Sequence, residues 1–327
     1  MKRGVKRALI MMAIVGVLVW GSSFAFAQQE EYPKKPITIV VPWAPGGTSS
    51  VIALALASEL GDYFGVRVLV SNKPGASGAK GTLYVKNARP DGYTLSQAWI
   101  AGFAQVPLYH EDPGYDPLKD FYPVAQVSAE PVVAVARKDA PWDTVREFIE
   151  DAKKDPEKYN WSGGGALSVH ALFFGELVHN AGVDMEGVLY QGATAALPDL
   201  LGGTIDVSAG TSTFLALHPE ELKAVGVFAE ERDPLFPDVP TIKEQGLQAP
   251  TVMSWSGIAV HIDTPDEIKW KLVDAFRKIL TSKEFKDKML KDANVRVRYR
   301  DPVGFYKTWL KSLEQMKAPI ERLKARA

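Results

Sequence analysis

The sequence of 327 residues contains no cysteine, which excludes disulfide bonds, thiolate nucleophiles and cysteine metal sites. Neither the Gly-x-Ser-x-Gly turn of many hydrolases nor the Gly-Lys-Ser/Thr end of a phosphate-binding loop occurs. The five histidines are scattered. His170 and His179 fall on one predicted helix but on opposite faces, because each residue turns a helix by about 100°. We therefore interpret the histidines as surface or capping residues and expect no metal, no cofactor and no catalytic residue.

Long apolar runs are also missing beyond the first 27 residues. Residues 1–7 carry four basic side chains and no acid, and residues 8–21 are almost wholly apolar. Ala25-Phe26-Ala27 then forms an Ala-x-Ala cleavage motif. These three features are typical of a secretory signal peptide that is cleaved after Ala27. An uncleaved anchor is the alternative, but the apolar run is shorter than the ~20 residues of a spanning helix. We expect a periplasmic or otherwise extracytoplasmic protein.

No run of basic residues is present either. Removal of residues 1–27 leaves 34 basic and 39 acidic residues, a net charge of −5. A mildly acidic chain is a poor partner for nucleic acid or for an anionic membrane. We therefore expect no nucleic-acid partner and no membrane insertion after signal removal, and any bound anion must be held by backbone dipoles or hydroxyl groups.

Residues 37–50 form the most informative stretch. A β-branched run, residues 37–41, stops at a loop with two prolines and the pair Gly46-Gly47, and an Ala/Leu-rich segment follows. This pattern predicts a buried strand, a tight loop and a helix over residues 50–64 capped by Thr48 or Ser49. A helix start carries unpaired N–H groups and attracts anions. An ordinary turn between a strand and a helix is the simpler interpretation.

The same device occurs again later in the chain. Residues 161–168 form a glycine-rich loop ahead of an apolar helix that ends near Gly182. A weaker third instance, residues 188–194, precedes a helix that carries Leu197, Leu200 and Leu201. The sequence thus offers one candidate anion loop in each half.

Strand and helix patterns alternate along the chain. Further strands are predicted at residues 66–70, 93–98, 131–136 and 251–260, and helices at residues 79–88, 144–154, 264–280, 283–291 and 302–325. Capping boxes open the helices at Thr144 and Thr264, the second with proline at its first helical position. The alternation predicts mainly parallel sheets with right-handed crossovers. The length suggests two domains, with the chain crossing near residue 131 and returning near residue 251.

Several short motifs occur together and in order. They are Pro-x-x-Pro-Gly-Gly (residues 42–47), Asn-Lys-Pro-Gly-Ala-x-Gly (72–78), Pro-Asp-Gly-Tyr-Thr-Leu (90–95), Tyr-x-Gly-Ala through Asp-Leu-Leu-Gly-Gly (190–203), Pro-Asp-Val-Pro-Thr-Ile-x-Glu-x-Gly (237–246), Ser-Trp-x-Gly (254–257) and Thr-Pro (264–265). With this ordered set the chain resembles the extracytoplasmic solute receptors of tripartite tricarboxylate transporters, the Bug family. The match runs over nearly all of the mature chain.

The resemblance implies an α/β periplasmic-binding-protein fold of type 2, with two doubly wound domains joined by two crossing strands. Domain 1 would comprise residues 28–130 and 251–327, and domain 2 residues 131–250. The implied function is capture of a small carboxylate between the domains and its delivery to a membrane permease, by a monomer without catalytic activity. The alternative from the residues alone is a secreted enzyme acting on carboxylates or esters.

The resemblance also implies, position by position, which residues contact the ligand. In domain 1 they are Trp43, Ala44, Gly46, Gly47 and Thr48. In domain 2 they are Gly164, Gly165, Ser168, Tyr190, Gly192, Ala193 and Thr194. Trp43 and Tyr190 are alternatively core aromatic residues.

Three departures from the family pattern stand out. Ser50 replaces the usual aspartate and Leu54 replaces the usual arginine. Both partners of an i, i+4 ion pair are therefore absent. If the aspartate oriented the loop or met an ammonium group on the ligand, this chain prefers a different solute. The serine that usually precedes the histidine at His170 is displaced to Ser168.

Overall fold

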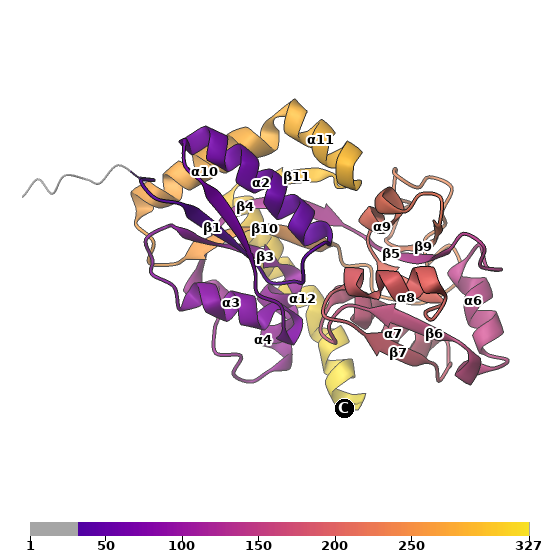
Figure 1. The fold of residues 1–327 in the computed structure, drawn as a ribbon. Helices are drawn as coiled ribbons and strands as arrows, with labels where there is room; N and C mark the ends of the chain where they lie inside the picture. Colours follow the sequence, from indigo (N-terminus) through magenta and orange to yellow (C-terminus); the bar gives the residue numbers. More distant parts are fainter. Residues whose placement is uncertain (1–31, 327) are drawn as a thin grey trace, which may run out of the picture. The chain divides into compact units, whose positions relative to one another are not determined.

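The computed structural model describes residues 32–326. The predicted signal peptide lies outside the described residues and stays a prediction. The chain divides into a short unit, Met1–Lys34, and a larger unit, Lys35–Ala327, which holds the two β-sheets (Figure 1). None of the helices within residues 32–326 combines the length and apolar character that crossing a bilayer requires.

The first sheet has six strands in the order β11-β4-β10-β3-β1-β2. Strand β1 lies between β2 and β3 and is parallel to both, whereas β10 runs antiparallel to β3 and β4, and β11 runs antiparallel to β4. Its strands span β1 Ile37–Val41, β2 Val68–Asn72, β3 Thr94–Trp99, β4 Phe121–Glu130, β10 Ser254–His261 and β11 Val297–Arg300.

The second sheet has five strands in the order β7-β6-β8-β5-β9. Strand β6 is parallel to β7 and β8, whereas β5 is antiparallel to β8 and β9. Its strands span β5 Val132–Arg137, β6 Asn160–Gly163, β7 Glu186–Leu189, β8 Val207–Gly210 and β9 Leu222–Phe228. Both sheets are therefore mixed, and the prediction of mainly parallel sheets is wrong in this respect.

Two chain segments connect the sheets. Strand β4 ends at Glu130 and β5 begins at Val132, so only Pro131 separates a strand of the first sheet from one of the second. The chain leaves the second sheet after β9 and re-enters the first at β10, between β3 and β4. The returning strand β10 is antiparallel to both neighbours, and it makes the first sheet mixed together with β11, which is antiparallel to β4. The predicted domain boundaries at residues 130 and 250 stay a prediction.

Helices cover both sheets. On the first sheet α2, α10 and α11 contact one another, and α12 contacts α4 (Figure 1). The helices span α2 Thr48–Phe64, α3 Ala79–Lys86, α4 Val106–Tyr109, α5 Pro117–Asp120, α6 Val145–Ala152, α7 Val169–Asn180, α8 Leu197–Gly202, α9 Ser212–Leu217, α10 Asp266–Thr281, α11 Lys283–Ala293 and α12 Pro302–Arg326.

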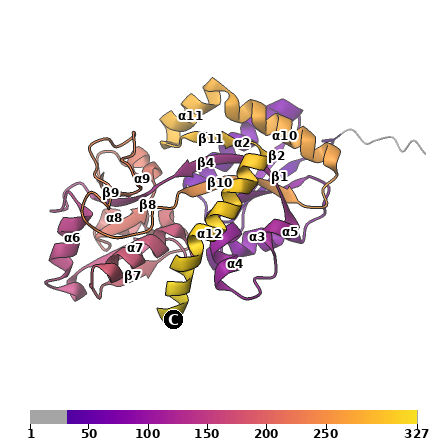
Figure 2. The same cartoon turned by 180° about the vertical axis from the view of Figure 1, so that it is seen from behind.

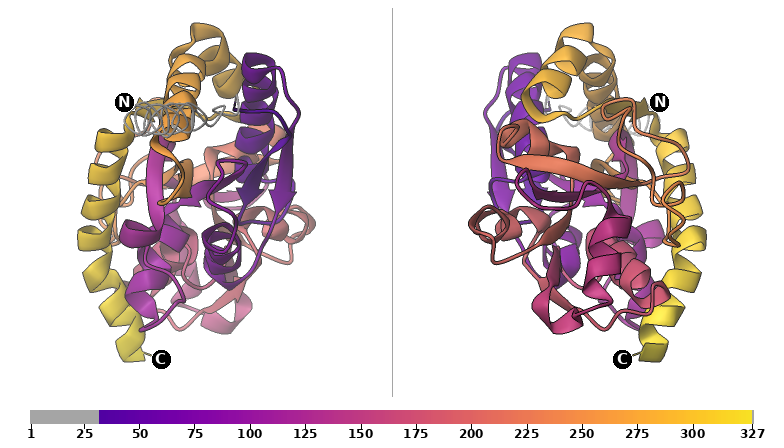
Figure 3. Two further views of the ribbon diagram at one scale, coloured as in Figure 1. Left: turned by 90° about the vertical axis from the view of Figure 1, so that its left-hand side faces the viewer. Right: turned by 90° about the vertical axis from the view of Figure 1, so that its right-hand side faces the viewer.

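The last helix connects both halves of the larger unit. It packs on β4 of the first sheet and continues to α7 beside the second sheet (Figures 2 and 3). Near its end Arg322 forms an ion pair with the buried Glu176 of α7. The helix therefore bridges elements of the two sheets at the side where the crossing strands run.

An aromatic cluster fills the core between α12 and the first sheet. Trp309 lies 4.9 Å from Phe103 and 5.2 Å from Phe305, measured between ring centroids. Trp255 of β10 donates its indole N–H to Ser312 Oγ at 2.7 Å, so its one polar group is satisfied.

The start of α2 differs from the prediction. Its first residue is Thr48, not Ser50, and its N-cap is Gly47, which has extended backbone and no capping side chain. Thr48 does not cap because its hydroxyl bonds to two threonines of the second domain, Thr211 and Thr213.

The second strand also differs, starting at Val68 where the pattern predicted Val66. Gly65 closes α2 in the left-handed conformation, and the carbonyl of Arg67 accepts a hydrogen bond from the N–H of Ile37. Strand β2 is an edge strand, so it tolerates the polar residues Ser71 and Asn72 that the apolar pattern left out.

Of the two predicted capping boxes, one is confirmed and one is wrong. Thr144 and Glu147 satisfy each other's backbone N–H groups at the start of α6. At α10 the N-cap is Pro265, with no side-chain cap, and the hydroxyl of Thr264 is buried without a partner among the described residues. Asp266 and Glu267 still stabilise this helix start through their charge.

We expect Gly257→Ala to lower the free energy of unfolding by about 2–4 kcal/mol. A Cβ at this position of β10 would overlap the ring of Phe305 and lie 2.6 Å from the carbonyl oxygen of Ala125. Urea unfolding followed by circular dichroism measures the change. Gly202→Ala is the matched control, because a Cβ there meets open space, and its stability should change by less than about 0.5 kcal/mol. Equal effects of both substitutions would contradict the packing.

Candidate functional site

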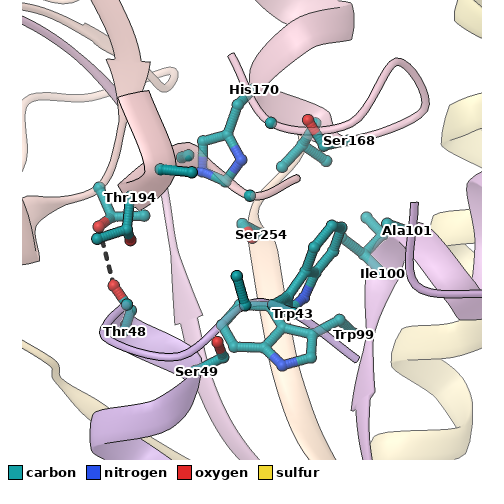
Figure 4. Close-up of a pocket in the computed structure, with 18 residues that line it drawn as sticks. Trp43, Thr48, Ser49, Trp99, Ile100, Ala101, Ser168, His170, Thr194 and Ser254 are labelled. Carbon is teal, nitrogen blue, oxygen red and sulfur yellow. Dashed lines mark hydrogen bonds between the residues drawn. The ribbon is translucent and has the colours of Figure 1, made fainter. Parts of the chain in front are cut away.

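A cavity lies between the loops of the two domains (Figure 4). It leaves about 60 Å³ for the centres of water-sized molecules, several times the ~10–15 Å³ that a single water needs. Both sheets contribute to its wall, from the first loop and the end of β3 on one side and from the loops before α7, α8 and α9 on the other. Its lining residues are Trp43, Ala44, Gly47, Thr48, Ser49, Trp99, Ile100, Ala101, Gly164, Ser168, Val169, His170, Gly192, Ala193, Thr194, Ala195, Thr211 and Ser254.

The loop between β1 and α2 is fixed by side chains of neighbouring strands. Asn72 of β2 donates its side-chain N–H to the carbonyl oxygen of Trp43 at 2.8 Å. Gln97 of β3 donates to the carbonyl oxygen of Ser49 at 3.0 Å. Gly81 lets α3 approach the same loop, since a Cβ there would lie 2.9 Å from Pro42. These contacts fix the loop and the start of α2, whose residues Thr48 and Ser49 line the cavity.

The facing loop between β6 and α7 is built around Ser168. Its hydroxyl accepts the N–H of Ala171 at 3.2 Å and so caps α7, which gives the displaced serine a structural role. A Cβ on Gly164 would lie 2.9 Å from this hydroxyl, so the close turn requires glycine. A third loop turns at Gly192, whose φ of +126° is in the region that glycine favours.

The two domains touch across the cavity. The hydroxyls of Thr48 and Thr211 lie 2.9 Å apart, and Thr48 donates to Thr213 Oγ1 at 2.7 Å. Figure 4 shows the first of these contacts as a dashed line. On another side the N–H of Leu167 donates to Ser77 Oγ at 3.1 Å. The structure therefore shows the two domains closed on the cavity.

Charged side chains are absent from the cavity wall among the described residues. Burial lowers the pKa of His170 to about 4, so its imidazole is neutral at pH 7. The positive potential that remains comes from the starts of α2 and α7. Such a helix start stabilises an anion by about 0.3–1 kcal/mol, and by up to about 2 kcal/mol when partly buried. Two like charges ~6 Å apart repel by ~3 kcal/mol at an effective dielectric constant of ~20.

Two ring nitrogens of the wall have no hydrogen-bond partner. Trp99 Nε1 and His170 Nε2 are both buried and unpaired among the described residues. In Figure 4 Trp43 and Trp99 lie together on one side of the cavity and His170 on the other. The interpretation of His170 as a surface or capping residue is therefore wrong. Its neighbours in sequence gave no signal of burial.

Nine of the twelve predicted ligand contacts line this cavity. They are Trp43, Ala44, Gly47, Thr48, Gly164, Ser168, Gly192, Ala193 and Thr194. Their role as ligand contacts stays a prediction.

The other three predicted residues lie outside the wall. Gly46 is exposed, with a φ of +91°. A Cβ on Gly165 would lie 2.7 Å from Ser77 Oγ, so Gly165 contributes to domain contact. Tyr190 donates its hydroxyl to Asp199 Oδ2 at 2.6 Å, and burial together with this carboxylate raises its pKa to about 12.

Several lining residues were not predicted. Trp99 is the last residue of β3, and Ile100 and Ala101 follow it. Strand β3 neighbours β1 in the sheet, and the adjacent carboxyl ends of parallel strands are a signal that could have found these residues. Thr211 follows the end of β8 in the same way. Ser254 begins the returning strand β10 and the motif Ser-Trp-x-Gly, which was not predicted to be part of a site.

The departures at Ser50 and Leu54 do not reach the cavity wall. Ser50 is buried and its hydroxyl lies 3.4 Å from the side-chain nitrogen of Asn72, whereas Leu54 is 60% exposed. Ser50 therefore lies outside the wall and contacts Asn72, which in turn holds the carbonyl oxygen of Trp43. No cluster of three or more potential metal ligands occurs within residues 32–326.

Two α/β domains joined by two crossing strands, with a loop-lined cavity between them, define a solute-binding receptor. The model of the tripartite tricarboxylate transporter family receptor matches residues 52–324. The chain belongs to this family.

The chain is also similar in sequence to proteins of other bacteria. A UPF0065 protein of Agrobacterium vitis is 32% identical over 284 residues, 85% of this chain and 82% of that protein. BugT of Bordetella pertussis is 29% identical over 267 residues, 79% of this chain and 80% of that protein.

The chain is also similar in fold to solved structures. The periplasmic binding protein BugD is 30% identical with a TM-score of 0.81, covering 90% of this chain and 98% of BugD. MatC from Rhodopseudomonas palustris with bound malate is 28% identical with a TM-score of 0.81, covering 88% of this chain and all of MatC. The predicted family and fold are thus confirmed. Because the family consists of transporter receptors, the alternative of a secreted enzyme is not retained.

The neutral state of His170 predicts a pH dependence. The unfolded chain takes up a proton near pH 6.5 and the folded chain only near pH 4, so stability is lost as the pH falls between these values. Between pH 7.5 and 4.5 the wild type should lose about 2–3 kcal/mol more free energy of unfolding than His170→Gln. Urea unfolding at both pH values measures this. His179→Gln, at an exposed position of α7, is the control and should behave like the wild type.

Proposed function

We propose that this protein captures a small carboxylate in the cavity between its two domains and delivers it to a membrane permease. The observation that carries the proposal is the placement of two helix starts, from α2 and α7, on opposite sides of a cavity in a receptor of this family. Backbone N–H groups at a helix start bind anions. The relative MatC holds malate, a carboxylate, in a similar fold, which supports the same ligand chemistry for this chain.

The nine predicted contacts in the cavity wall divide between two tasks under this proposal. Gly47, Thr48 and Gly164 present backbone N–H groups to the carboxylate, and Ser168 presents its hydroxyl. Trp43, Ala44 and Ala193 form the wall against the rest of the ligand. Gly192 and Thr194 close the cavity from the second domain. Gly46, Gly165 and Tyr190 support these loops from outside the wall.

Ligand release requires the domains to separate. Opening would break the hydrogen bonds from Thr48 to Thr211 and Thr213 and from Leu167 to Ser77. Each of these hydrogen bonds is neutral and worth about 0.5–1.5 kcal/mol, and the ion pairs Arg296–Asp233 and Arg322–Glu176 also link the two domains. A bound carboxylate that contacts both domains would add to them and favour the closed form. The permease could then recognise the closed form.

The cellular location of the protein is inferred from its family. The family acts as transport receptors, and BugD is a periplasmic binding protein. We propose that this chain is likewise extracytoplasmic, is exported by residues 1–27, is cleaved after Ala27 and acts as a monomer. Domain 1 is then residues 28–130 with 251–327, and domain 2 residues 131–250.

Substitution of Gly47 tests the site. A Cβ on Gly47 would overlap Thr194 Oγ1 and lie 3.3 Å from Thr194 Cβ, so Gly47→Val should hold the domains apart and fill the space beside the α2 start. We expect at least a ~100-fold loss of affinity, about 2.7 kcal/mol. A thermal-shift screen of mono-, di- and tricarboxylates identifies a ligand, and calorimetry measures its binding to both proteins.

Two controls accompany this measurement. Gly202→Ala, with open space around its Cβ, should bind like the wild type, and circular dichroism should show that Gly47→Val remains folded. Chemical analysis of the ligand after incubation should return it unchanged. Wild-type affinity in folded Gly47→Val would remove the first loop from the site, and a converted ligand would contradict a receptor.

A further inference from the structure

Glu130 lies at the point where the chain crosses from the first domain to the second. It is the last residue of β4, and only Pro131 separates it from β5 of the second sheet. In the first sheet it is paired with Ser254, which begins the returning strand and lines the cavity. An acidic side chain therefore occupies the place where both connecting segments run side by side.

Groups from both domains surround the carboxyl group of Glu130. Ser212, at the start of α9 in the second domain, has its hydroxyl oxygen 3.4 Å from Glu130 Oε2. The charged groups that face the carboxyl group are Asp233, which follows β9, and Arg296 and Arg298, before and within β11. Arg296 of the first domain forms an ion pair with the buried Asp233 of the second. Contact between the domains therefore encloses this carboxyl group.

The hydrogen bonds around the carboxyl group favour its protonated form. Glu130 Oε1 is buried and has no partner among the described residues. The hydroxyl of Ser212 donates to the carbonyl oxygen of Asn294 at 3.1 Å, which is a shorter contact than the one with Glu130. A hydroxyl has a single proton, so Ser212 Oγ is left as an acceptor to which a protonated Glu130 can donate.

Burial and charge act in the same direction as these hydrogen bonds. Burial disfavours the charged form and raises the pKa of Glu130 to about 8, and the nearby Asp233 adds to this effect. The hydroxyl of Ser212 and the guanidinium groups of Arg296 and Arg298 oppose the rise without reversing it. Arg296 is already engaged by Asp233. In water, by contrast, a glutamate has a pKa of about 4.3.

We infer that closure of the two domains takes up a proton at Glu130, so that the closed form is favoured as the pH falls. When the cavity opens, Ser212 and Asp233 move away with the second domain, water reaches the carboxyl group, and the proton is released. Between about pH 5 and pH 8 the closed form therefore holds one more proton than the open form. The effect on ligand binding rests on the proposed function, whereas closure itself can be followed without a ligand.

The pH dependence of ligand affinity tests the inference. A carboxylate from the screen whose carboxyl groups are all ionised above pH 6.5 is titrated by calorimetry at pH 6.5, 7.5 and 8.5, a range in which His170 stays neutral. Because binding requires closure, the wild type should bind at least about 10-fold more weakly at pH 8.5 than at pH 6.5. At pH 7.5 it should take up at least about half a proton per ligand, measured from the difference between HEPES and Tris buffers.

Two variants accompany this titration. Glu130→Gln keeps the size of the side chain without its charge, so its affinity should change less than about 2-fold over the same range. Glu186→Gln, at an exposed position of the edge strand β7, is the matched control and should keep the wild-type dependence. Thermal unfolding checks that both variants are folded. An affinity that does not fall with pH in the wild type, or a fall that persists in folded Glu130→Gln, would overturn the inference.

A measurement without ligand separates the inference from the proposed function. Because the chain has no cysteine, Ser58→Cys on α2 and Glu157→Cys in the second domain, both at exposed positions, can each carry a spin label. Electron paramagnetic resonance should show two label distances whose populations change between pH 6.5 and pH 8.5, and Glu130→Gln should remove this change. Identical distances at both pH values would overturn the inference even if a carboxylate binds. If the distances change but no carboxylate binds, the inference stands and the proposed function fails.

Discussion

The close approach of the loop before α2 to the second domain is the constraint on which the site depends. Gly47 has no Cβ, and this absence lets Thr194 come close enough for the domains to shut on a small cavity. The next residue, Thr48, uses its hydroxyl for Thr211 and Thr213 instead of capping its own helix. The first N–H groups of α2 therefore remain uncapped by a side chain and available to a ligand.

The remaining architecture holds this arrangement in place. Asn72 and Gln97 fix the first loop from neighbouring strands, and Ser168 fixes the facing loop by capping α7. At the domain contact, Ala76 and Ser77 adopt positive φ angles of 49° and 50°, which cost of order 1 kcal/mol or more each for residues with a Cβ. This local strain lies where Ser77 meets Leu167.

Much of the fold was readable from local patterns. The strand, glycine loop and helix at residues 37–64 and the helices at residues 144–154, 264–280 and 302–325 are confirmed, since apolar periodicity and flanking glycines and prolines act over a few residues. The strand β4, at the centre of the crossing, was not predicted, and the capping boxes succeeded at Thr144 but not at Thr264. At Thr264 the neighbouring Pro265 takes the cap position, so the hydroxyl has no role there.

The sequence by itself determined the family and the two glycine loops, because each depends on residue identity or on short-range order. Only the tertiary structure decided which residues share the cavity. It added Trp99, His170, Thr211 and Ser254 to the wall and removed Gly46, Gly165 and Tyr190 from it. The reason is physical: a cavity between two domains is defined by side chains that meet after the chain has crossed and returned, and no local pattern records that pairing.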